Sequence, residues 1–482
     1  MASTLALVLY SVLFALAAVA VWRRPLIALY LFLVGLAAHN LVMALLWGAG
    51  VRGNSLEAIA AWKDGLLAVA LLRVALDALR ARQLAFRPGV VDLLAAAFGC
   101  IVAVYAVVPQ GSLGGLAGPS AVGHALRHDL LPVAAYFVGR SVVITRTELR
   151  RLAWALLGAG SALAAFGLIE EYTVPVGWWR HSGAVGYFHD QLGFRYHGPG
   201  GLPENFAFNS SDGLFRRLVS TFISPLATAY VLVAALLLAP WRRLAIPLAV
   251  LCAVGLLFTV SRSALAGLVV GLVVLALASR RSWPLAGALV TVALGLAFGY
   301  GFTSIAPRTH FFKSDLAYQQ AYARAHPGAT RKVFSANEPS IRSHLSNLRD
   351  GLKTVARHPQ GYGLGNAGAT AARFEVPLKA GESNYTEIGV ETGLVGMLLF
   401  LAWNLALFAG LLRTARREEA PPETAGMAAA FAAVLVVSIQ TDAFGIPWLG
   451  ICLWWLGGTL LAPCTERMAA AAHARPAIVE SG

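Results

Sequence analysis

The chain has 482 residues, of which 58% are hydrophobic and only 13% charged, and its mean hydropathy is +0.66. A water-soluble protein of this length does not have such a composition, so the sequence indicates a polytopic membrane protein. The formal net charge of +14 does not indicate a nucleic-acid-binding protein. A nucleic-acid binder would concentrate its charge in a soluble recognition module, and the sequence contains none.

Apolar segments of about 17 to 25 residues, long enough to cross a hydrocarbon core as helices, recur along the whole chain. We predict spans at 4–21, 25–48, 56–78, 88–108, 129–146, 150–170, 219–240, 243–260, 263–279, 284–303, 387–412, 425–442 and 445–462. The predicted fold class is therefore an all-α polytopic membrane protein with about 12–13 transmembrane helices and two large loops that contain short helices.

Arginines mark the short connections between alternate spans. The clusters are Arg23 with Arg24, Arg80 with Arg82 and Arg87, Arg146 with Arg150 and Arg151, Arg242 with Arg243, Arg280 with Arg281, and Arg413 with Arg416 and Arg417. Because short arginine-rich loops stay in the cytoplasm, we expect the N-terminus outside and the C-terminus inside. The two long connections, 171–214 and 303–385, then lie on the outer face, where their many arginines need another explanation.

This topology divides the chain into six parts. They are the N-terminal transmembrane helices in 1–170, a first periplasmic loop in 171–218, central transmembrane helices in 219–303, a second periplasmic loop in 304–386, C-terminal transmembrane helices in 387–463, and a cytoplasmic tail in 464–482.

The third span carries Lys63 beside Asp64, and Arg73 four residues before Asp77. Opposite charges that are adjacent or four residues apart on a helix can neutralise each other, so we expect internal pairing near the membrane ends. Lys63 remains a secondary candidate for contact with an anionic substrate.

The first long connection is rich in aromatic and polar side chains. These residues are Trp178, Trp179, Arg180, His181, Tyr187, Phe188, His189, Asp190, Phe194, Arg195, Tyr196 and His197. Such rings suit the faces of sugars, and they equally suit an aromatic belt at the membrane interface.

The same connection ends in Arg216 and Arg217, just before a span begins on the outer face. Free N–H groups at a helix N-terminus together with an arginine are suited to bind a pyrophosphate. One arginine of the pair could instead anchor the span at the lipid headgroups, and we expect Arg217 to be the functional one.

Arg262 lies in a very short outer connection between two spans. Either it anchors the connection at the headgroups, or its small neighbours Ser261, Ser263 and Ala264 let the guanidinium approach a ligand closely.

The second long connection contains a predicted amphipathic helix. Its apolar stripe consists of Ile341, Leu345, Leu348, Leu352 and Val355, and its polar flank of Arg342, His344, Arg349, Lys353 and Arg357. The helix could lie on anionic lipid, or its arginines could bind phosphate oxygens. His344 is a candidate base or substrate ligand. The glycines that follow do not form a dinucleotide site, because no strand precedes them and no phosphate-binding helix follows.

Glu382 is the most informative carboxylate of this connection. It lies just before a span, beside Ser383, Asn384 and Tyr385, where it could accept a proton from an attacking hydroxyl. Alternatively it is a helix-start carboxylate stabilised by the helix dipole.

Three stretches resemble the O-antigen polymerase and O-antigen ligase superfamily, membrane glycosyltransferases that use polyprenyl-pyrophosphate-linked glycans. The stretch from Arg217 to Pro225 is similar to the family's element at the end of its first large periplasmic loop. The stretch from Thr259 to Arg262 is similar to the family's serine-arginine turn. The third stretch runs from Arg342 to Gly365 and continues in Glu382–Tyr385 and Glu391–Gly393. Ligases of the family usually carry His-Asn where this chain has Glu382-Ser383.

The resemblance implies a GT-C-like, periplasm-facing glycosyltransferase of the bacterial inner membrane that polymerises undecaprenyl-pyrophosphate-linked oligosaccharide repeats. In this interpretation Glu382 and His344 are catalytic, whereas Arg217, Arg342, Arg262 and Arg216 bind pyrophosphate. An inverting reaction with no metal and no cofactor is expected. The expected partners are a glycan donor and acceptor, the lipid bilayer, a flippase and a chain-length regulator. The alternatives are an O-antigen ligase or protein O-oligosaccharyltransferase, and less favourably a transporter of lipid-linked glycans.

Overall fold

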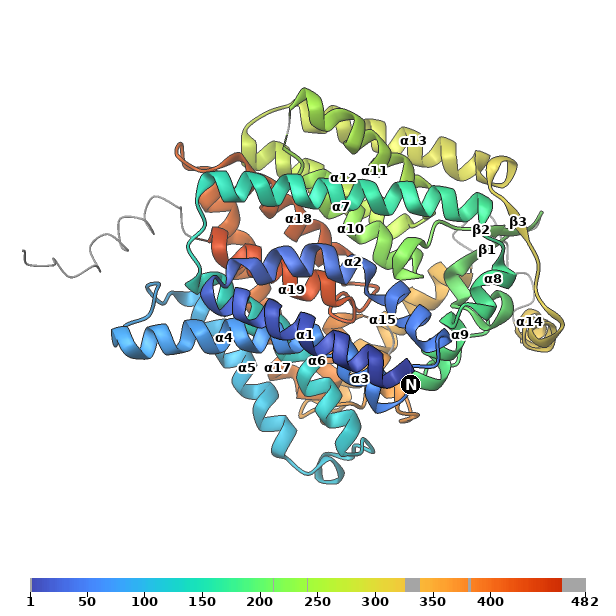
Figure 1. Cartoon of the computed structure of the whole chain (residues 1–482), viewed down its shortest axis with the longest axis horizontal. Helices are drawn as coiled ribbons and strands as arrows, with labels where there is room; N and C mark the ends of the chain where they lie inside the picture. The colour runs from blue at the N-terminus through green and yellow to red at the C-terminus, as the bar shows by residue number, and fades with distance from the viewer. Residues whose placement is uncertain (1, 211, 241, 326–338, 380–382, 462–482) are drawn as a thin grey trace, which may run out of the picture.

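The computed structural model describes the whole chain except residues 1, 211, 241, 326–338, 380–382 and 462–482. The described residues form nineteen α-helices and three short strands, which confirms the predicted all-α membrane fold (Figure 1). The helices are α1 (Ala2–Arg23), α2 (Leu26–Gly48), α3 (Asn54–Ala60), α4 (Trp62–Ala81), α5 (Val90–Val107), α6 (Pro119–Ser141), α7 (Arg146–Thr173), α8 (Val176–His181), α9 (Ala184–Gly186), α10 (Pro225–Leu237), α11 (Ile246–Phe258), α12 (Arg262–Ser279), α13 (Trp283–Ile305), α14 (Lys313–Ala325), α15 (Pro339–Arg357), α16 (Gly368–Arg373), α17 (Asn384–Ala415), α18 (Pro422–Val437) and α19 (Pro447–Leu460). The strands are β1 (Ala207–Ser210), β2 (Gly213–Arg216) and β3 (Arg308–Thr309).

Each predicted span coincides with a helix of the bundle, and these helices are α1, α2, α4–α7, α10–α13 and α17–α19. Among the described residues seven helices are long and apolar enough to cross a membrane, namely α1, α2, α5, α7, α12, α13 and α17. Some helices are shorter than predicted. The span expected at 219–240, for example, becomes the 13-residue α10, because Ser224 caps the helix and Pro225 occupies its first position.

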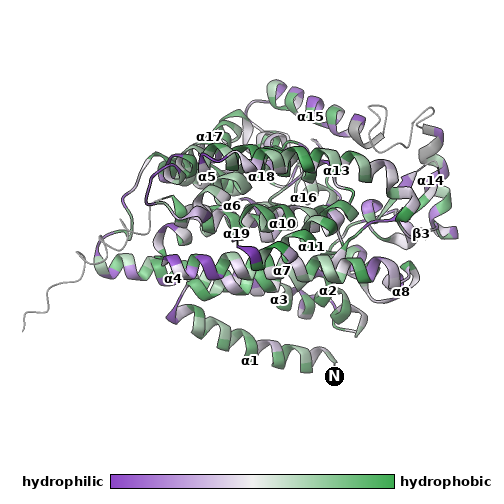
Figure 2. Ribbon diagram, turned by 90° about the horizontal axis from the view of Figure 1, so that it is seen from above, coloured by the Kyte–Doolittle hydropathy of each residue, from purple (hydrophilic) through white to green (hydrophobic). Residues whose placement is uncertain are grey.

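The helices form a buried centre and an apolar periphery. The helices α10, α18 and α19 are almost wholly buried, and Trp448, Trp454 and Trp455 of α19 are at most 1% exposed. In contrast, α1 leaves a row of leucine and valine side chains exposed and lies at the edge of the molecule, where it packs against α4 (Figure 2). An exposed apolar helix is what a lipid environment stabilises.

The short arginine-bearing connections gather at one end of the bundle. Arg24 forms an ion pair with Glu148, and the Arg146 guanidinium donates to the Glu419 carbonyl at 2.7 Å. The N-terminal helix α1 begins toward the other end, beside α3 and near α9 (Figure 1). The segregation of connections agrees with the predicted alternation, and the side of the membrane that each end faces stays a prediction.

The sequence did not predict the small sheet, which joins the two long connections. β1 and β2 pair antiparallel within the first connection, and β2 also pairs antiparallel with β3, which follows α13. The Arg216 amide extends this contact by donating to the Pro307 carbonyl at 2.8 Å. The two connections therefore form one assembly on the bundle rather than two separate loops.

Helix α17 is interrupted at Gly393, whose φ of 73° lies in the left-handed region. The glycine-rich segment 361–365 packs into this break: the amides of Tyr362 and Gly363 donate to the carbonyls of Val390 and Glu391 at 2.7 and 3.0 Å. A Cβ at Gly361 would lie 2.5 Å from the Gly393 nitrogen, so the close approach requires glycine. These glycines therefore pack directly against α17.

Candidate active site

Two of the motif arginines meet where the first long connection returns to the bundle. The Arg217 guanidinium donates from Nε to the Thr259 carbonyl at 2.8 Å and from Nη2 to the Val260 carbonyl at 3.3 Å. These carbonyls immediately precede Ser261, which caps α12, and Arg262, the first residue of that helix. Arg217 and Arg262 are both partly exposed. The structure thus brings together two motifs that are more than forty residues apart in the sequence.

A hydroxyl network leads from this turn to the connection between α18 and α19. The Tyr230 hydroxyl lies 3.0 Å from Ser263 Oγ and 3.2 Å from Thr441 Oγ1. Thr441 is followed by Asp442, whose carboxylate accepts from Asn384 Nδ2 at 2.8 Å and from the Gly445 amide at 2.8 Å. The serine-arginine turn and the start of α17 are therefore connected through Tyr230 and the 441–445 segment.

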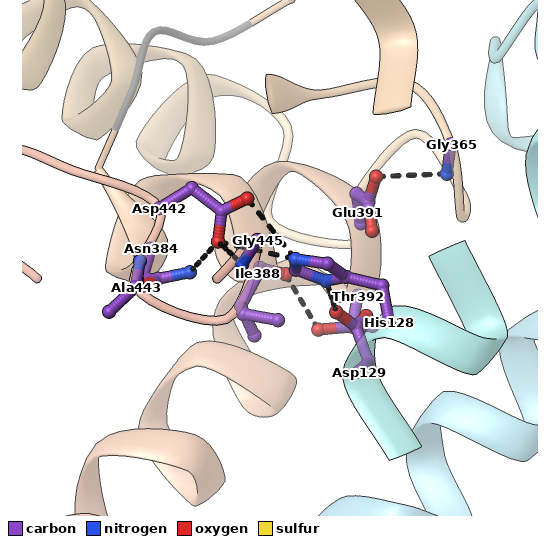
Figure 3. Close-up of polar contacts among 10 residues, drawn as sticks. All are labelled: His128, Asp129, Gly365, Asn384, Ile388, Glu391, Thr392, Asp442, Ala443 and Gly445. Carbon is purple, nitrogen blue, oxygen red and sulfur yellow. Dashed lines mark hydrogen bonds and ion pairs between the residues drawn. The ribbon is translucent and has the colours of Figure 1, made fainter. Parts of the chain in front are cut away.

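His128 on α6 lies between two carboxylates (Figure 3). Its Nδ1 is 2.8 Å from Asp129 Oδ1, and its Nε2 is 3.1 Å from Asp442 Oδ2. Burial raises the pKa of the Asp442 carboxyl, but the His128 charge and the hydrogen bonds from His128, Gly445 and Asn384 outweigh burial and lower this pKa below its ordinary value. Since both ring nitrogens face carboxylate oxygens, the arrangement suits an imidazolium that donates a hydrogen bond to each carboxylate.

Two glutamates of α17 face the same small cavity. Glu387 and Glu391 line it together with His128, Asp129, Asn384 and Asp442, and its volume is about 10 Å³. That is roughly the volume that one water molecule requires. Glu391 accepts from the Gly365 amide at 2.9 Å, so this carboxylate also holds the glycine-rich segment (Figure 3). The cavity combines proton acceptors with a water-sized space near the N-terminal end of α17.

Arg216 has a different environment from Arg217. Its guanidinium is only 3% exposed, forms an ion pair with Glu170 at the end of α7, and donates to the Val174 carbonyl at 2.7 Å. Trp179 donates to the same Glu170 carboxylate at 2.5 Å. Arg216 therefore ties the first long connection to α7. The pyrophosphate contact expected of Arg216 stays a prediction.

Arg342 and His344 lie on α15, and the helix predicted for this segment is confirmed. The last turns of α15 pack on the start of α17: Val355 contacts a small apolar cluster with Val390, and a Cβ at Gly351 would lie 2.7 Å from Thr386. Arg342 is exposed, and His344 is partly exposed. Val355 of the apolar stripe is buried, whereas Leu345 and Leu352 are 64% and 48% exposed. Helix α15 lies at the edge of the molecule (Figure 2).

Glu382 lies outside the described residues, and the first residues after it are firmly held. Ser383 Oγ donates to the Ser438 carbonyl at 3.4 Å, and Asn384 Oδ1 accepts from the Ala443 amide at 2.5 Å. Tyr385 donates to the Leu435 carbonyl at 2.9 Å. The polar motif that follows Glu382 thus serves to fix the start of α17 on the end of α18.

The predicted charge pairing in the third span is confirmed for Arg73 and Asp77, at 2.8 Å, and is wrong for Lys63 and Asp64. Asp64 instead pairs with Arg127 of α6 at 2.8 Å, and the buried Lys63 ammonium donates to the Ala60 carbonyl at 2.7 Å. Helix α4 begins at Trp62, so adjacent side chains on its first turn point in different directions and cannot pair.

Most aromatic residues of the first long connection form a core rather than a surface. Trp179, Tyr187 and Phe188 are at most 7% exposed and pack with Phe206 and Val219. Neither a sugar-binding surface nor an interfacial belt describes these three rings. Trp178, 46% exposed, is still available for either role.

The sequence did not predict the group around His128. His128 and Asp442 are 314 residues apart, and each lies at the edge of a predicted span, where no local motif marks it. The available signal was the polar pair His128-Asp129 at the start of an apolar segment, because such residues are costly at the membrane and usually face a cavity. In the part of the chain that the structure describes, no group of three or more histidine, cysteine or carboxylate side chains is arranged to hold a metal ion.

Comparison with known proteins gives one family match, and no curated protein matches the chain. Residues 247–401 match the family model described as O-antigen ligase. This range contains the serine-arginine turn, α15, the glycine-rich segment and the first half of α17, whereas Arg217 and His128 lie outside it. The resemblance to the O-antigen polymerase and ligase superfamily, predicted from the sequence motifs, is confirmed by this match over residues 247–401.

Proposed function

We propose that this multi-pass membrane protein is a glycosyltransferase that polymerises oligosaccharide repeats carried on undecaprenyl pyrophosphate, at the periplasmic face of a bacterial inner membrane. The observation that carries the proposal is the contact of Arg217 with the Thr259 and Val260 carbonyls, which joins two arginine motifs of the family type in one place. Guanidinium groups bind phosphate oxygens in bidentate geometry and keep their charge when partly buried.

In the proposed reaction Arg217 and Arg262, with Arg342 from α15, bind the donor's pyrophosphate. The acceptor hydroxyl attacks the anomeric carbon, the anomeric C–O bond breaks, and the bonding electrons pass to the pyrophosphate as it leaves. Fixed positive charge stabilises the negative charge that develops on the leaving group. A single displacement of this kind inverts the anomeric configuration.

The acceptor proton passes to a carboxylate at the start of α17. We assign this role to Glu382, with His344 as a second group able to accept the proton. The His128–Asp442 pair supports the assignment because Asp442 holds Asn384, two residues after Glu382 in the chain. A base acts only when it lies within hydrogen-bonding reach of the proton, so the rigid neighbour helps to hold the geometry.

A second candidate function is transfer of the finished glycan to lipid A core or to a protein hydroxyl, which is ligase chemistry. The family match, whose description is O-antigen ligase, favours this alternative. Against it, the chain carries Glu382-Ser383 where ligases of the family usually have His-Asn. Polymerase and ligase use the same donor and differ in the acceptor.

The test is the length distribution of the polysaccharide in a deletion strain complemented with Glu382→Gln, Arg217→Ala or Arg342→Ala at equal membrane levels. We expect each variant to lose long polymer, whereas Glu375→Gln and Arg195→Ala, an exposed ion pair in the same two connections, should retain it. Surface glycan with single repeats supports a polymerase, and accumulation of long unligated chains supports a ligase. Full-length polymer with all three variants would contradict the proposed mechanism.

A further inference from the structure

A cluster of basic residues lies beside the small cavity and has no part in the mechanism above. It consists of Lys63 at the start of α4, Arg127 on α6, and Arg373 at the end of α16. Arg373 lies within electrostatic reach of Arg127, and Lys63 within reach of both. His124, one turn before His128 on α6, adds an imidazole that contacts Phe374 with 5.7 Å between ring centroids.

The protein neutralises only part of this positive charge. Arg127 pairs with Asp64 at 2.8 Å, and the Glu57 carboxylate lies within electrostatic reach of Arg373. The Lys63 side chain is 5% exposed and donates to the Ala60 carbonyl. Among the described residues, the Arg373 guanidinium contacts the Phe374 ring, at 5.5 Å from the centroid, and has no carboxylate or carbonyl partner of its own. Burial and the neighbouring Arg127 charge lower the pKa of Arg373.

The position of these residues also departs from the topological pattern. Arginine and lysine near span ends are expected on the cytoplasmic side, yet all three lie at span ends or in a connection assigned to the outer side. Burying like charges close together is unfavourable unless an anion lies between them. The arrangement therefore suits the binding of an anion.

The cluster is distinct from the Arg217–Arg262 pair. The path between them runs from Ser263 through Tyr230 and Thr441 to Asp442, then through His128 to Arg127. Along this path lie the carboxylates of Asp442, Asp129, Glu387 and Glu391, which line the cavity. Because these carboxylates repel phosphate, we expect the two basic groups to bind separate anions. Two basic groups on either side of a proton acceptor fit two anionic substrates better than one.

Helix α16 connects the cavity to the basic cluster. Ala369 and Thr370 line the cavity, and Arg373, one turn later, belongs to the cluster. The Arg373 carbonyl would lie 2.5 Å from a Cβ at Gly193, so this end of α16 is pressed against the first long connection. A ligand bound by Arg373 is thereby held at a fixed position relative to the cavity.

We propose that Lys63, Arg127 and Arg373 bind an anionic group of the acceptor substrate, either a phosphate of its lipid carrier or a sugar carboxylate. This inference rests on the proposed glycosyl transfer, in which Arg217 and Arg262 hold the donor. In this proposal the donor binds at Arg217 and Arg262, and the acceptor binds at Lys63, Arg127 and Arg373. Lys63 then makes the contact with an anionic substrate for which the sequence made it a candidate.

The test uses the full chain in lipid nanodiscs with Arg217→Ala in the background, which weakens binding at the donor site. Binding of inorganic pyrophosphate and of glucuronate is measured by calorimetry, with Arg373→Gln as the variant, Arg373→Lys as its charge-preserving partner, and Arg195→Gln as the control. We expect Arg373→Gln to raise the Kd of at least one probe by tenfold or more, and Arg373→Lys to preserve most of the binding. Weakened pyrophosphate binding identifies the carrier phosphate, and weakened glucuronate binding identifies a sugar carboxylate. Unchanged Kd values for both probes, or equal losses in Arg195→Gln, would overturn the proposal.

A transfer assay separates this inference from the proposed function. With Arg217 intact, Arg373→Gln should raise KM for the acceptor about tenfold and leave KM for the donor unchanged. An increase in donor KM, or no increase in either, would overturn the acceptor assignment. If instead Arg217→Ala transfers glycan as fast as the unmodified chain, the proposed function fails while the binding measurement still tests the anion site.

Discussion

The two ends of the helix bundle hold positive charge in different ways. At the end where the short connections gather, Arg24 pairs with Glu148 and Arg140 with Asp92, and Arg146 bonds to a backbone carbonyl. At the other end Arg216 and Arg127 are also paired, with Glu170 and Asp64, but four carboxylates, those of Asp129, Glu387, Glu391 and Asp442, gather around His128 with basic groups on both sides. Such a gathering of titratable groups is typical of a functional site.

Arg216 and Arg217, which are adjacent in the sequence, also differ in how their charge is held. Arg216 is buried in an ion pair with Glu170, and Arg217 is partly exposed and bonded to the turn before Arg262. Arg216 is the last residue of β2 and its side chain enters the protein, whereas Arg217 follows the strand and its side chain reaches the turn before Arg262. The two arginines should therefore respond very differently to replacement.

The largest effect is expected from Arg216→Ala. This change leaves the Glu170 carboxylate buried without its cation, which typically costs about 3–5 kcal/mol. We expect the midpoint of thermal unfolding in detergent to fall sharply. The double variant Arg216→Met with Glu170→Met, which removes both charges, should recover most of the loss. A single variant as stable as the unmodified chain would show that the pair is dispensable.

Arg217→Ala should leave stability nearly unchanged and reduce the rate of glycosyl transfer. Loss of one fixed donor to a developing negative charge typically costs about 10²–10³ in kcat. The measurement is transfer from a polyprenyl-pyrophosphate-linked glycan by the full chain in nanodiscs. Arg280→Gln, in a short connection at the opposite end, is the matched control and should transfer at the normal rate. Equal losses in both variants would remove the distinction between the two ends.

The contrast between the ends was only partly predictable from the sequence. Hydropathy and arginine alternation predicted the helices and the gathering of Arg24, Arg146 and their equivalents, because these signals are local. The partner of Asp64 was predicted wrongly, because Arg127 approaches it from a different helix. His128 and Asp442 were missed for the same reason, since only packing brings α6 against the connection between α18 and α19.

The sequence motifs marked Arg217 and Arg262 and did not show that they meet. Their contact depends on the end of the first long connection folding against the start of α12, which no local pattern specifies. The small sheet was missed because each strand has only two to four residues, too few for an alternating pattern to be recognised.

His128→Gln should reduce transfer by about 10-fold to 10²-fold, because it loosens Asp442 and the start of α17 by a fraction of an ångström or more. The reduction should appear in kcat, with KM for both substrates little changed, since His128 is a positioning residue in the proposed mechanism. Asn384→Ala, which removes the other side-chain contact to Asp442, should give a similar loss. A rise in KM without a change in kcat would instead indicate that His128 contacts a substrate.

The smallest effect is expected from Arg195→Ala. Arg195 lies at the same end of the bundle as the basic cluster, but its side chain is 70% exposed and paired at 2.5 Å with Glu375, which is 68% exposed. Exposed ion pairs contribute roughly 0.2–1 kcal/mol and are screened by salt, so unfolding and transfer should both change little. Arg195 carries the same charge as Arg373 but has a carboxylate partner. Comparison of the two variants therefore tests whether an arginine at this end of the bundle contributes to function merely by its location or because it has no carboxylate partner. If Arg195→Ala lost as much transfer activity as Arg373→Gln, the total positive charge at this end of the bundle, rather than particular residues, would determine the activity.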